Sequence, residues 1–356
     1  MLDHLLTAMI TTATIRTYRV PVLLDVLEAR LDAAGARPAA NGARAGSAER
    51  FRDRPLPTQR GEPVGGRLIG EYLAAQRDAL VANDPGARAG DSDAVHDLRI
   101  AVRRLRCTLR AFRPLLRSET TEPLRAELGW LGRRLGAVRD ADVMSANLAA
   151  AIDAVDPELI VGPVADRIGR RVARGAEKAR SRLLRALASQ RYAGLLDRLD
   201  QLVAEPRAIS YQQATACAAK ALRRADRKLD AALRHPPRAP VAAAASGETA
   251  LHEARKAYKR ARYALEVVLP AAGHPARRLV RRLRVMQDLL GDLHDAWLTA
   301  DLLRDHGMRA HLAGENAFSY GILVADRNAA ARDLLARLPR ARRRLRKPRL
   351  RHWLER

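Results

Sequence analysis

The sequence has few aromatic residues and few lysines. Aromatic side chains make up 4% of the 356 residues, and only six of the 65 Lys and Arg residues are lysines. Strands favour aromatic and β-branched residues, whereas the abundant Ala, Leu and Arg are strong helix formers. We therefore expect an all-α protein. A hydrophobic content of 47% is enough for a packed core.

Cysteines and long apolar runs are also scarce. The two cysteines, Cys107 and Cys217, have neither metal-binding nor redox spacing. No run of 18 or more apolar residues predicts a transmembrane helix, and the first residues lack the basic and then apolar pattern of a secretory signal. These absences predict a cytoplasmic protein with no cofactor and no membrane association.

Positive charge is abundant, because Lys and Arg outnumber Asp and Glu by 65 to 40 and leave a net charge of +25. Arginine offers planar, permanently charged donors that match phosphate oxygens two at a time. A GC-rich coding bias is the alternative explanation of so much Ala and Arg. Such a bias would scatter arginine around each helix, whereas a binding function would gather it on one face.

The pattern of apolar residues and turns divides the chain into four parts. Residues 1–62 predict one short helix and a flexible linker, residues 63–206 a first helical repeat and residues 207–338 a second. Residues 339–356 form a basic tail, in which eight of the twelve residues Arg340–Arg351 are Arg or Lys; we expect it to be solvated. Helices are expected at about 68–84, 93–116, 124–151 with a break near Gly136, 159–188, 193–203, 209–234, 248–269, 275–304 and 311–338.

Two blocks of sequence recur at nearly the same offset. Val95–Arg99 (VHDLR) matches Leu251–Arg255 (LHEAR) 156 residues later, and Leu135–Ala141 (LGAVRDA) matches Leu290–Ala296 (LGDLHDA) 155 residues later. The coincidence of the offsets predicts an internal duplication, with two related four-helix units.

Each copy of the first block begins a column of cationic side chains on one helix face. The first column is His96, Arg99, Arg103, Arg106 and Arg110, and no carboxylate interrupts it. The second column is His252, Arg255, Lys259 and Arg262, which ends at Glu266. Like charges one turn apart destabilise an isolated helix, so the columns indicate an external anion. A solvated charged face is the alternative.

Further candidate contacts lie beside the columns and in the second block. Asp140 and Asp295 are expected to orient basic side chains. The glycines at 136 and 291 are expected to allow close helix packing. The additional cationic candidates are Arg104, Arg139, Lys256, Arg260, Arg284 and His294, with Arg133 and Arg281 as weaker ones.

The histidines of the columns are expected to bind phosphate. His96, His252 and His294 have no second histidine three or four residues on, and neighbouring arginines would repel a metal cation. We expect no metal site. Since a bound phosphate favours protonated imidazole, His96 and His252 are expected to take up protons on binding, with affinity rising as the pH falls from about 8 to 6.

At these residues the sequence resembles the CHAD family, the conserved histidine α-helical domains. The resemblance covers about 63–338 and rests on His96-x-x-Arg99-x-x-x-Arg103-Arg104-x-Arg106, on His252-x-x-Arg255-x-x-x-Lys259-Arg260-x-Arg262, and on the Gly136 and Gly291 blocks. It implies two four-helix bundles related by a pseudo-twofold axis, with basic helices facing a shared groove. It also implies binding of inorganic polyphosphate, association with polyphosphate granules and no catalytic reaction.

The segment Leu23–Ala39 (LLDVLEARLDAAGARPA) faintly resembles the closing part of a CYTH domain, which often precedes CHAD. The acidic Glu-x-Glu-x-Lys strand of the CYTH enzymes is absent from this sequence. The resemblance implies that the segment is the remnant of a lost or truncated partner domain.

Two other functions stay open on the sequence. The first is weak, salt-sensitive binding of nucleic acid, driven by the same charge, although no aromatic platform for bases interleaves the first column. The second is an enzyme that works through a phosphohistidine at His96 or His252, for which the sequence offers no metal-binding carboxylate cluster. The oligomeric state is open.

Overall fold

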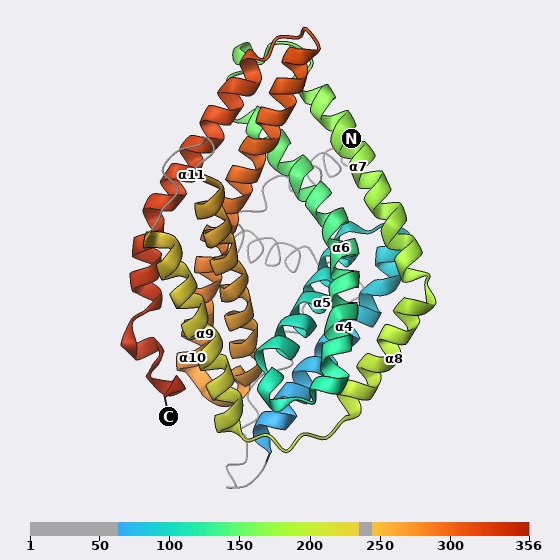
Figure 1. The fold of residues 1–356 in the computed structure, drawn as a ribbon, viewed down its shortest axis with the longest axis vertical. Helices are drawn as coiled ribbons and strands as arrows, with labels where there is room; N and C mark the ends of the chain where they lie inside the picture. The colour runs from blue at the N-terminus through green and yellow to red at the C-terminus, as the bar shows by residue number, and fades with distance from the viewer. Residues whose placement is uncertain (1–62, 235–243, 356) are drawn as a thin grey trace, which may run out of the picture. The chain divides into compact units, whose positions relative to one another are not determined.

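The structure, a computed structural model, describes residues 63–234 and 244–355. These residues form α-helices joined by short turns, and no strand occurs among them, which confirms the all-α prediction (Figure 1). The predicted N-terminal helix, the linker and the CYTH-like segment lie outside the described residues. The helices are α4 (Val64–Ala89), α5 (Ser92–Ala111), α6 (Ser118–Asp153), α7 (Val164–Leu187), α8 (Gln190–Ala204), α9 (Tyr211–Arg234), α10 (Ala244–Leu312) and α11 (Phe318–Leu345).

Helix α10 consists of two arms that meet at Gly273. This glycine has φ 68° and ψ −154°, a conformation outside the helical region that few residues other than glycine adopt. We refer to residues 244–272 as the first arm and to residues 274–312 as the second arm. The break confirms the sequence prediction that separate helices end near 269 and begin near 275.

The helices pack in two groups. In the first group α5 packs against α4 and α6, and α7 packs against α6; in the second, α10 packs against α9 and α11. Helix α10 also contacts α5 and α4, so the two groups meet along the basic helices. None of the described helices combines the length and the apolar character that a bilayer span requires.

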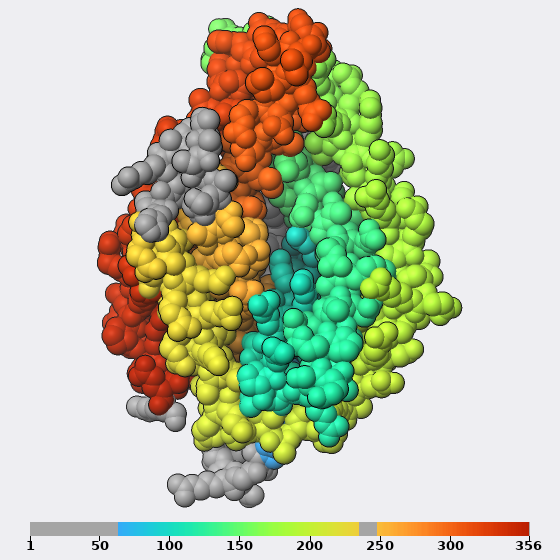
Figure 2. Space-filling view, in the orientation of Figure 1, coloured from blue at the N-terminus to red at the C-terminus, as the bar shows by residue number. Residues whose placement is uncertain are grey.

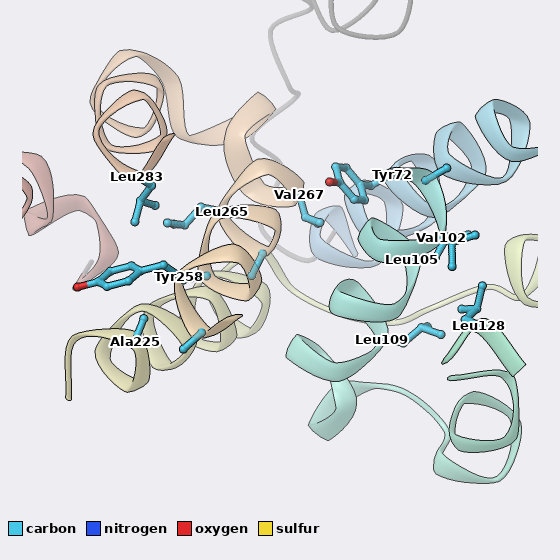
Figure 3. Close-up of a cluster of buried hydrophobic side chains, with 14 of the residues drawn as sticks. Tyr72, Val102, Leu105, Leu109, Leu128, Ala225, Tyr258, Leu265, Val267 and Leu283 are labelled. Atoms are coloured by element: carbon cyan, nitrogen blue, oxygen red, sulfur yellow. The ribbon is translucent and has the colours of Figure 1, made fainter. Parts of the chain in front are cut away.

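One large apolar core extends through both groups. Tyr258, Leu265 and Leu283 are fully buried within the second group, and Leu105 and Leu109 within the first (Figure 3). A smaller core joins α6 and α7 to the far ends of α10 and α11, and includes Leu148, Ile168, Leu303 and Tyr320. The two groups are therefore held together at two separate places.

Two glycines at the start of α4 allow the connection between α8 and α9 to pack closely. A Cβ atom at Gly65 would lie 2.2 Å from the carbonyl oxygen of Ser210, and one at Gly66 would lie 2.0 Å from that of Arg207. The Gly66 N–H donates to the Ile209 carbonyl at 2.9 Å. This hydrogen bond links the first group to the beginning of the second.

The helix boundaries differ from the predicted ones in several places. The second arm of α10 continues to Leu312, past the predicted end near 304, and α11 begins at Phe318 and not near 311. Helix α4 continues past Pro85 to Ala89 and ends at Gly90, whose φ of 89° closes the helix. Helix α6 begins before Pro123 and has no break near Gly136. A proline near a helix end removes only one backbone donor, and a buried glycine is tolerated within a well-packed helix.

The basic tail is packed in part, which corrects the prediction of a solvated tail for Arg346 and Arg351 but not for the exposed Arg340, Arg343, Arg344, Lys347 and Arg349. Helix α11 extends to Leu345, and both Leu345 and Leu350 are buried. Arg346 pairs with Asp230 at 2.8 Å, and Arg351 pairs with Asp226 at 2.5 Å. The carboxylates of α9 therefore hold part of the tail against the second group.

The matched sequence blocks lie on corresponding elements. The His96 block is on α5 and the His252 block is on the first arm of α10, whereas the Gly136 and Gly291 blocks are on α6 and on the second arm. Internal duplication with a pseudo-twofold axis stays a prediction.

Candidate anion-binding site

A cleft lined mainly by cations opens where α5 and α6 face α9 and α10. Its volume is about 460 Å³. Figure 2 shows the surface hollowed between the yellow and orange helices and the teal ones. We name it the basic cleft. Its cationic lining residues are Arg99, Arg103, Arg106, Arg110, Arg125, Arg133, Arg224, Lys228, Lys256, Lys259 and Arg260.

Helix α5 supplies one wall because its two faces differ in character. Leu98, Leu105 and Leu109 are buried in the core. The adjoining face carries the four arginines of the first predicted column, and all four line the cleft. Arg103 also donates from Nε to the hydroxyl of the buried Tyr263 at 3.1 Å, which fixes its position between the two helix groups.

The first arm of α10 supplies the opposite wall through Lys256, Lys259 and Arg260. Lys259 is only partly exposed and lies among arginines of both walls. Burial lowers the pKa of Lys259 to about 7, and the positive charges of Arg255, Arg103 and Arg99 contribute to this shift. Burial, with these charges added to it, therefore lets Lys259 lose its proton near neutrality.

Helices α6 and α9 complete the cleft with residues that the sequence reading missed or ranked low. The sequence indicates Arg133 only as a weaker candidate for anion contact and does not indicate Arg125, Arg224 or Lys228. Arg224 and Lys228 are one turn apart on α9, opposite the buried Leu222 and Leu229. That spacing was visible in the sequence, but no local pattern shows that α9 faces the first column.

One carboxylate lines the basic cleft, and two lysines hold it. The carboxylate oxygens of Glu253 lie 2.9 Å from Nζ of Lys228 and 2.5 Å from Nζ of Lys256. Hydrogen bonds from Lys256 and Lys228 lower the pKa of Glu253 to about 2. It stays ionised and offsets only part of the surrounding positive charge.

The second sequence blocks meet beside the basic cleft. Arg99 donates from Nη2 to Oδ1 of Asp140 at 2.9 Å, so Asp140 orients a basic side chain as predicted. Arg139 lies close enough to His96 and Arg99 to lower the pKa of both, although burial is the larger cause. Asp295 is near Asp140, and burial raises the pKa of Asp295.

The two histidines of α10, His252 and His294, lie next to each other. The ring centroids of His252 and His294 are 4.4 Å apart, with the planes tilted by 42°. Burial lowers the pKa of each to about 4; for His252 the charge of His294 adds to this, and for His294 that of Arg255 does. Both imidazoles are therefore neutral near pH 7. In the protein without ligand they titrate below the range of about pH 8 to 6 in which the sequence predicts that affinity rises.

Gly291 makes room for one of the cations. A Cβ atom at this position would lie 3.3 Å from Nη2 of Arg255. The glycine in the second arm therefore lets the Arg255 guanidinium pass close to the helix. At Gly136 a Cβ atom would meet only Asp140, at 3.9 Å, so close packing explains Gly291 and not Gly136.

Arg104 and Arg262 lie apart from the basic cleft, around the buried carboxylate of Glu266. Arg262 Nη1 is 3.0 Å from Oε1 of Glu266 and Arg104 Nε is 3.8 Å from Oε2, to which the Tyr72 hydroxyl also donates. Both guanidinium groups lie over the Tyr263 ring, at 4.6 and 5.8 Å from its centroid. These contacts join α4, α5 and α10.

The remaining two candidates are on the second arm of α10. Arg284 is exposed and does not line the basic cleft. Arg281 is also exposed and lines a different cleft, beside the tail. No group of three or more His, Cys, Asp or Glu side chains that could hold a metal ion occurs within residues 63–234 and 244–355.

This arrangement can bind an extended anion, since its donors come from four helices whose other faces pack in the core. Fold and site together define a helical protein with a preformed basic cleft. Residues 71–304 match the CHAD domain family, and the chain belongs to that family.

Two curated relatives and two solved structures are similar to the chain. The uncharacterized proteins MT2285 and Rv2226 of Mycobacterium tuberculosis are each 33% identical over 315 residues, which is 85% of this chain. The chain spans 57% of the length of these relatives.

The solved structures share the fold. PptA from Streptomyces chartreusis superposes with a TM-score of 0.64 at 23% identity, over 78% of this chain and 98% of that one. The CHAD domain from the plant Ricinus communis superposes with a TM-score of 0.56 at 23% identity, over 82% and 91%.

Proposed function

We propose that this protein binds a polyanion in the basic cleft and that the polyanion is inorganic polyphosphate. The observation that carries the proposal is the lining of the cleft, in which eleven cations from four helices surround a single carboxylate. Charge-assisted hydrogen bonds from arginine to phosphate oxygens are strong and can be bidentate. Preformed donors also avoid much of the entropy that ordering side chains costs on binding.

The chemistry of the lining favours a phosphate chain over nucleic acid. Proteins that bind single strands stack the bases on aromatic side chains, and the lining contains no aromatic residue in the described part of the chain. Its apolar members are Val102, Cys107 and Leu128, which offer no flat platform. Nucleic acid therefore remains a weaker, charge-driven ligand, as is common for strongly basic proteins.

We propose further that the protein binds polyphosphate without transforming it and accompanies polyphosphate granules in the cytoplasm. A phosphohistidine mechanism at His96 or His252 is the competing proposal, because burial lowers the pKa of both imidazoles and favours the neutral form that a nucleophile requires. A phosphoryl group on either histidine after incubation with polyphosphate, detected as an acid-labile modification by mass spectrometry, would establish that mechanism instead.

A competition titration tests the identity of the ligand. Fluorescently labelled polyphosphate is bound to the protein at about 200 mM salt, where nonspecific binding is weak, and is displaced by unlabelled polyphosphate, duplex DNA or heparin. We expect polyphosphate to displace the label at the lowest concentration of anionic groups. Displacement by duplex DNA at an equal or lower concentration would contradict the proposal.

A further inference from the structure

A second cleft with cationic walls lies between the second arm of α10 and the tail. Its volume is about 560 Å³, and its lining contains no carboxylate. We name it the outer cleft. It has no lining residue in common with the basic cleft. Its lining residues are Arg278, Arg281, Arg282, Val285, Arg344, Lys347, Arg349 and Leu350.

The α10 wall of the outer cleft follows from the helix period. Leu279, Leu283 and Met286 are buried in the core of the second group. Arg278, Arg281 and Arg282 with Val285 recur at steps of three and four on the opposite face, and all four are exposed. The guanidinium groups therefore lie over one turn and a half of a helix whose other face is fixed.

The second wall is formed by the tail, and its paired arginines hold it in place. Arg346 and Arg351 bind the carboxylates of Asp230 and Asp226, while Leu350 is buried. The other cations of this wall are Arg344, Lys347 and Arg349, which are exposed and line the cleft. The basic tail thus carries two sets of cations, one paired with α9 and one directed to the outer cleft.

The six cations of the outer cleft lack carboxylate partners within the described residues, where no ion pair includes any of them. Two acidic side chains, Asp288 and Asp292, line an adjoining cleft that shares Arg282, Val285 and Arg344 with the outer cleft. Six like charges on fixed backbone repel one another. A bound anion would relieve that repulsion. The adjoining carboxylates would repel the anion and so limit the binding site at one end.

We propose that the outer cleft is a second binding site for inorganic phosphate chains. The identity of its ligand rests on the proposed function of the basic cleft. Arginine matches phosphate oxygens in a bidentate manner, and the apolar lining residues Val285 and Leu350 offer no stacking surface for bases. With two clefts, one protein molecule joins two segments of phosphate chain, which raises its avidity for long chains over short ones.

The test counts bound tripolyphosphate by isothermal titration calorimetry. The wild-type chain is expected to bind two equivalents. The outer-cleft variant Arg281→Gln with Arg344→Gln, whose residues are exposed, is expected to bind one. The basic-cleft variant Arg106→Gln with Arg110→Gln is expected to weaken the other site only. A matched control, Arg170→Gln with Arg174→Gln on the exposed side of α7, removes the same charge outside both clefts and is expected to keep both equivalents.

The outcomes separate this inference from the proposed function. If the outer-cleft variant binds as many equivalents as the wild type, with equal affinity, the outer site is overturned and the basic cleft is unaffected. If the basic-cleft variant alone behaves like the wild type, the proposed function fails while the outer site stands. A loss of duplex DNA binding without a loss of tripolyphosphate binding in the outer-cleft variant would overturn the ligand assignment.

Discussion

Lys259 differs from the other cations of the basic cleft because it can lose its charge near neutral pH. Burial, and the charges of Arg255, Arg103 and Arg99, lower its pKa to about 7, whereas an unperturbed lysine titrates near about 10.4. A bound polyanion favours the protonated amine and raises the pKa again. Binding above pH 7 therefore takes up a proton.

The pH dependence of polyphosphate affinity is expected to follow Lys259. Below about pH 7 the lysine is charged before and after binding, so its contribution is constant. As the pH rises from about 7 to about 9, affinity falls because the free lysine is neutral and must be protonated on binding. Lys259→Arg keeps its charge throughout and is expected to flatten this dependence; calorimetry in buffers of different ionisation enthalpy measures the proton uptake.

His252→Gln is the control for this pH dependence. The pKa of His252 is about 4, so its removal is expected to leave the dependence above pH 7 unchanged. An identical pH dependence in wild type and in Lys259→Arg would assign the titration to another group. A flattened dependence in His252→Gln would restore the histidines as the proton acceptors, as the sequence reading expected.

At the scale of the elements, the contacts around Glu266 hold α4, α5 and α10 together. Its carboxylate is buried between Arg104 and Arg262 and accepts the Tyr72 hydroxyl. Glu266→Gln leaves two partly buried guanidinium groups without a counter-charge. We expect it to lower the free energy of unfolding by roughly 2 kcal/mol, measured by thermal or urea denaturation.

The same variant separates stability from binding, because Glu266 does not line the basic cleft. Polyphosphate affinity of the folded Glu266→Gln protein is expected to match that of the wild type. An unchanged midpoint of unfolding would show that the carboxylate contributes nothing to stability. Tighter binding by the folded variant would mean that Arg104 and Arg262, freed from the carboxylate, act as ligands, as the sequence motif suggested.

The helices were predictable because their apolar residues recur with the helical period, and this pattern predicted separate helices that end near 269 and begin near 275, on either side of the break in α10. The tail was not predictable in the same way. Its sequence looks like a solvated charge run, yet Arg351 and its partner Asp226 are 125 residues apart. Local patterns carry no information about such a pairing.

At the scale of the whole molecule, the basic cleft exists only where the two helix groups meet. All four arginines of the α5 column line this cleft, but of the α10 column only Lys259 does. The sequence could not assign Arg125, Arg224 and Lys228 to the same cleft, because that depends on how α6 and α9 pack. Nor could it separate Arg104 and Arg262 from the residues that line the cleft, as all of these are cations at helical spacing.

The central claim is that arginines placed in the basic cleft, rather than diffuse charge, bind polyphosphate. The most direct measurement compares polyphosphate affinity for Arg106→Gln with Arg110→Gln and for the control Arg170→Gln with Arg174→Gln. Both pairs are exposed arginines one turn apart on one helix, so the charge removed is equal. We predict at least about a tenfold loss for the cleft pair, equivalent to about 1.4 kcal/mol, and less than about twofold for the control. Equal losses in the two variants would contradict the account.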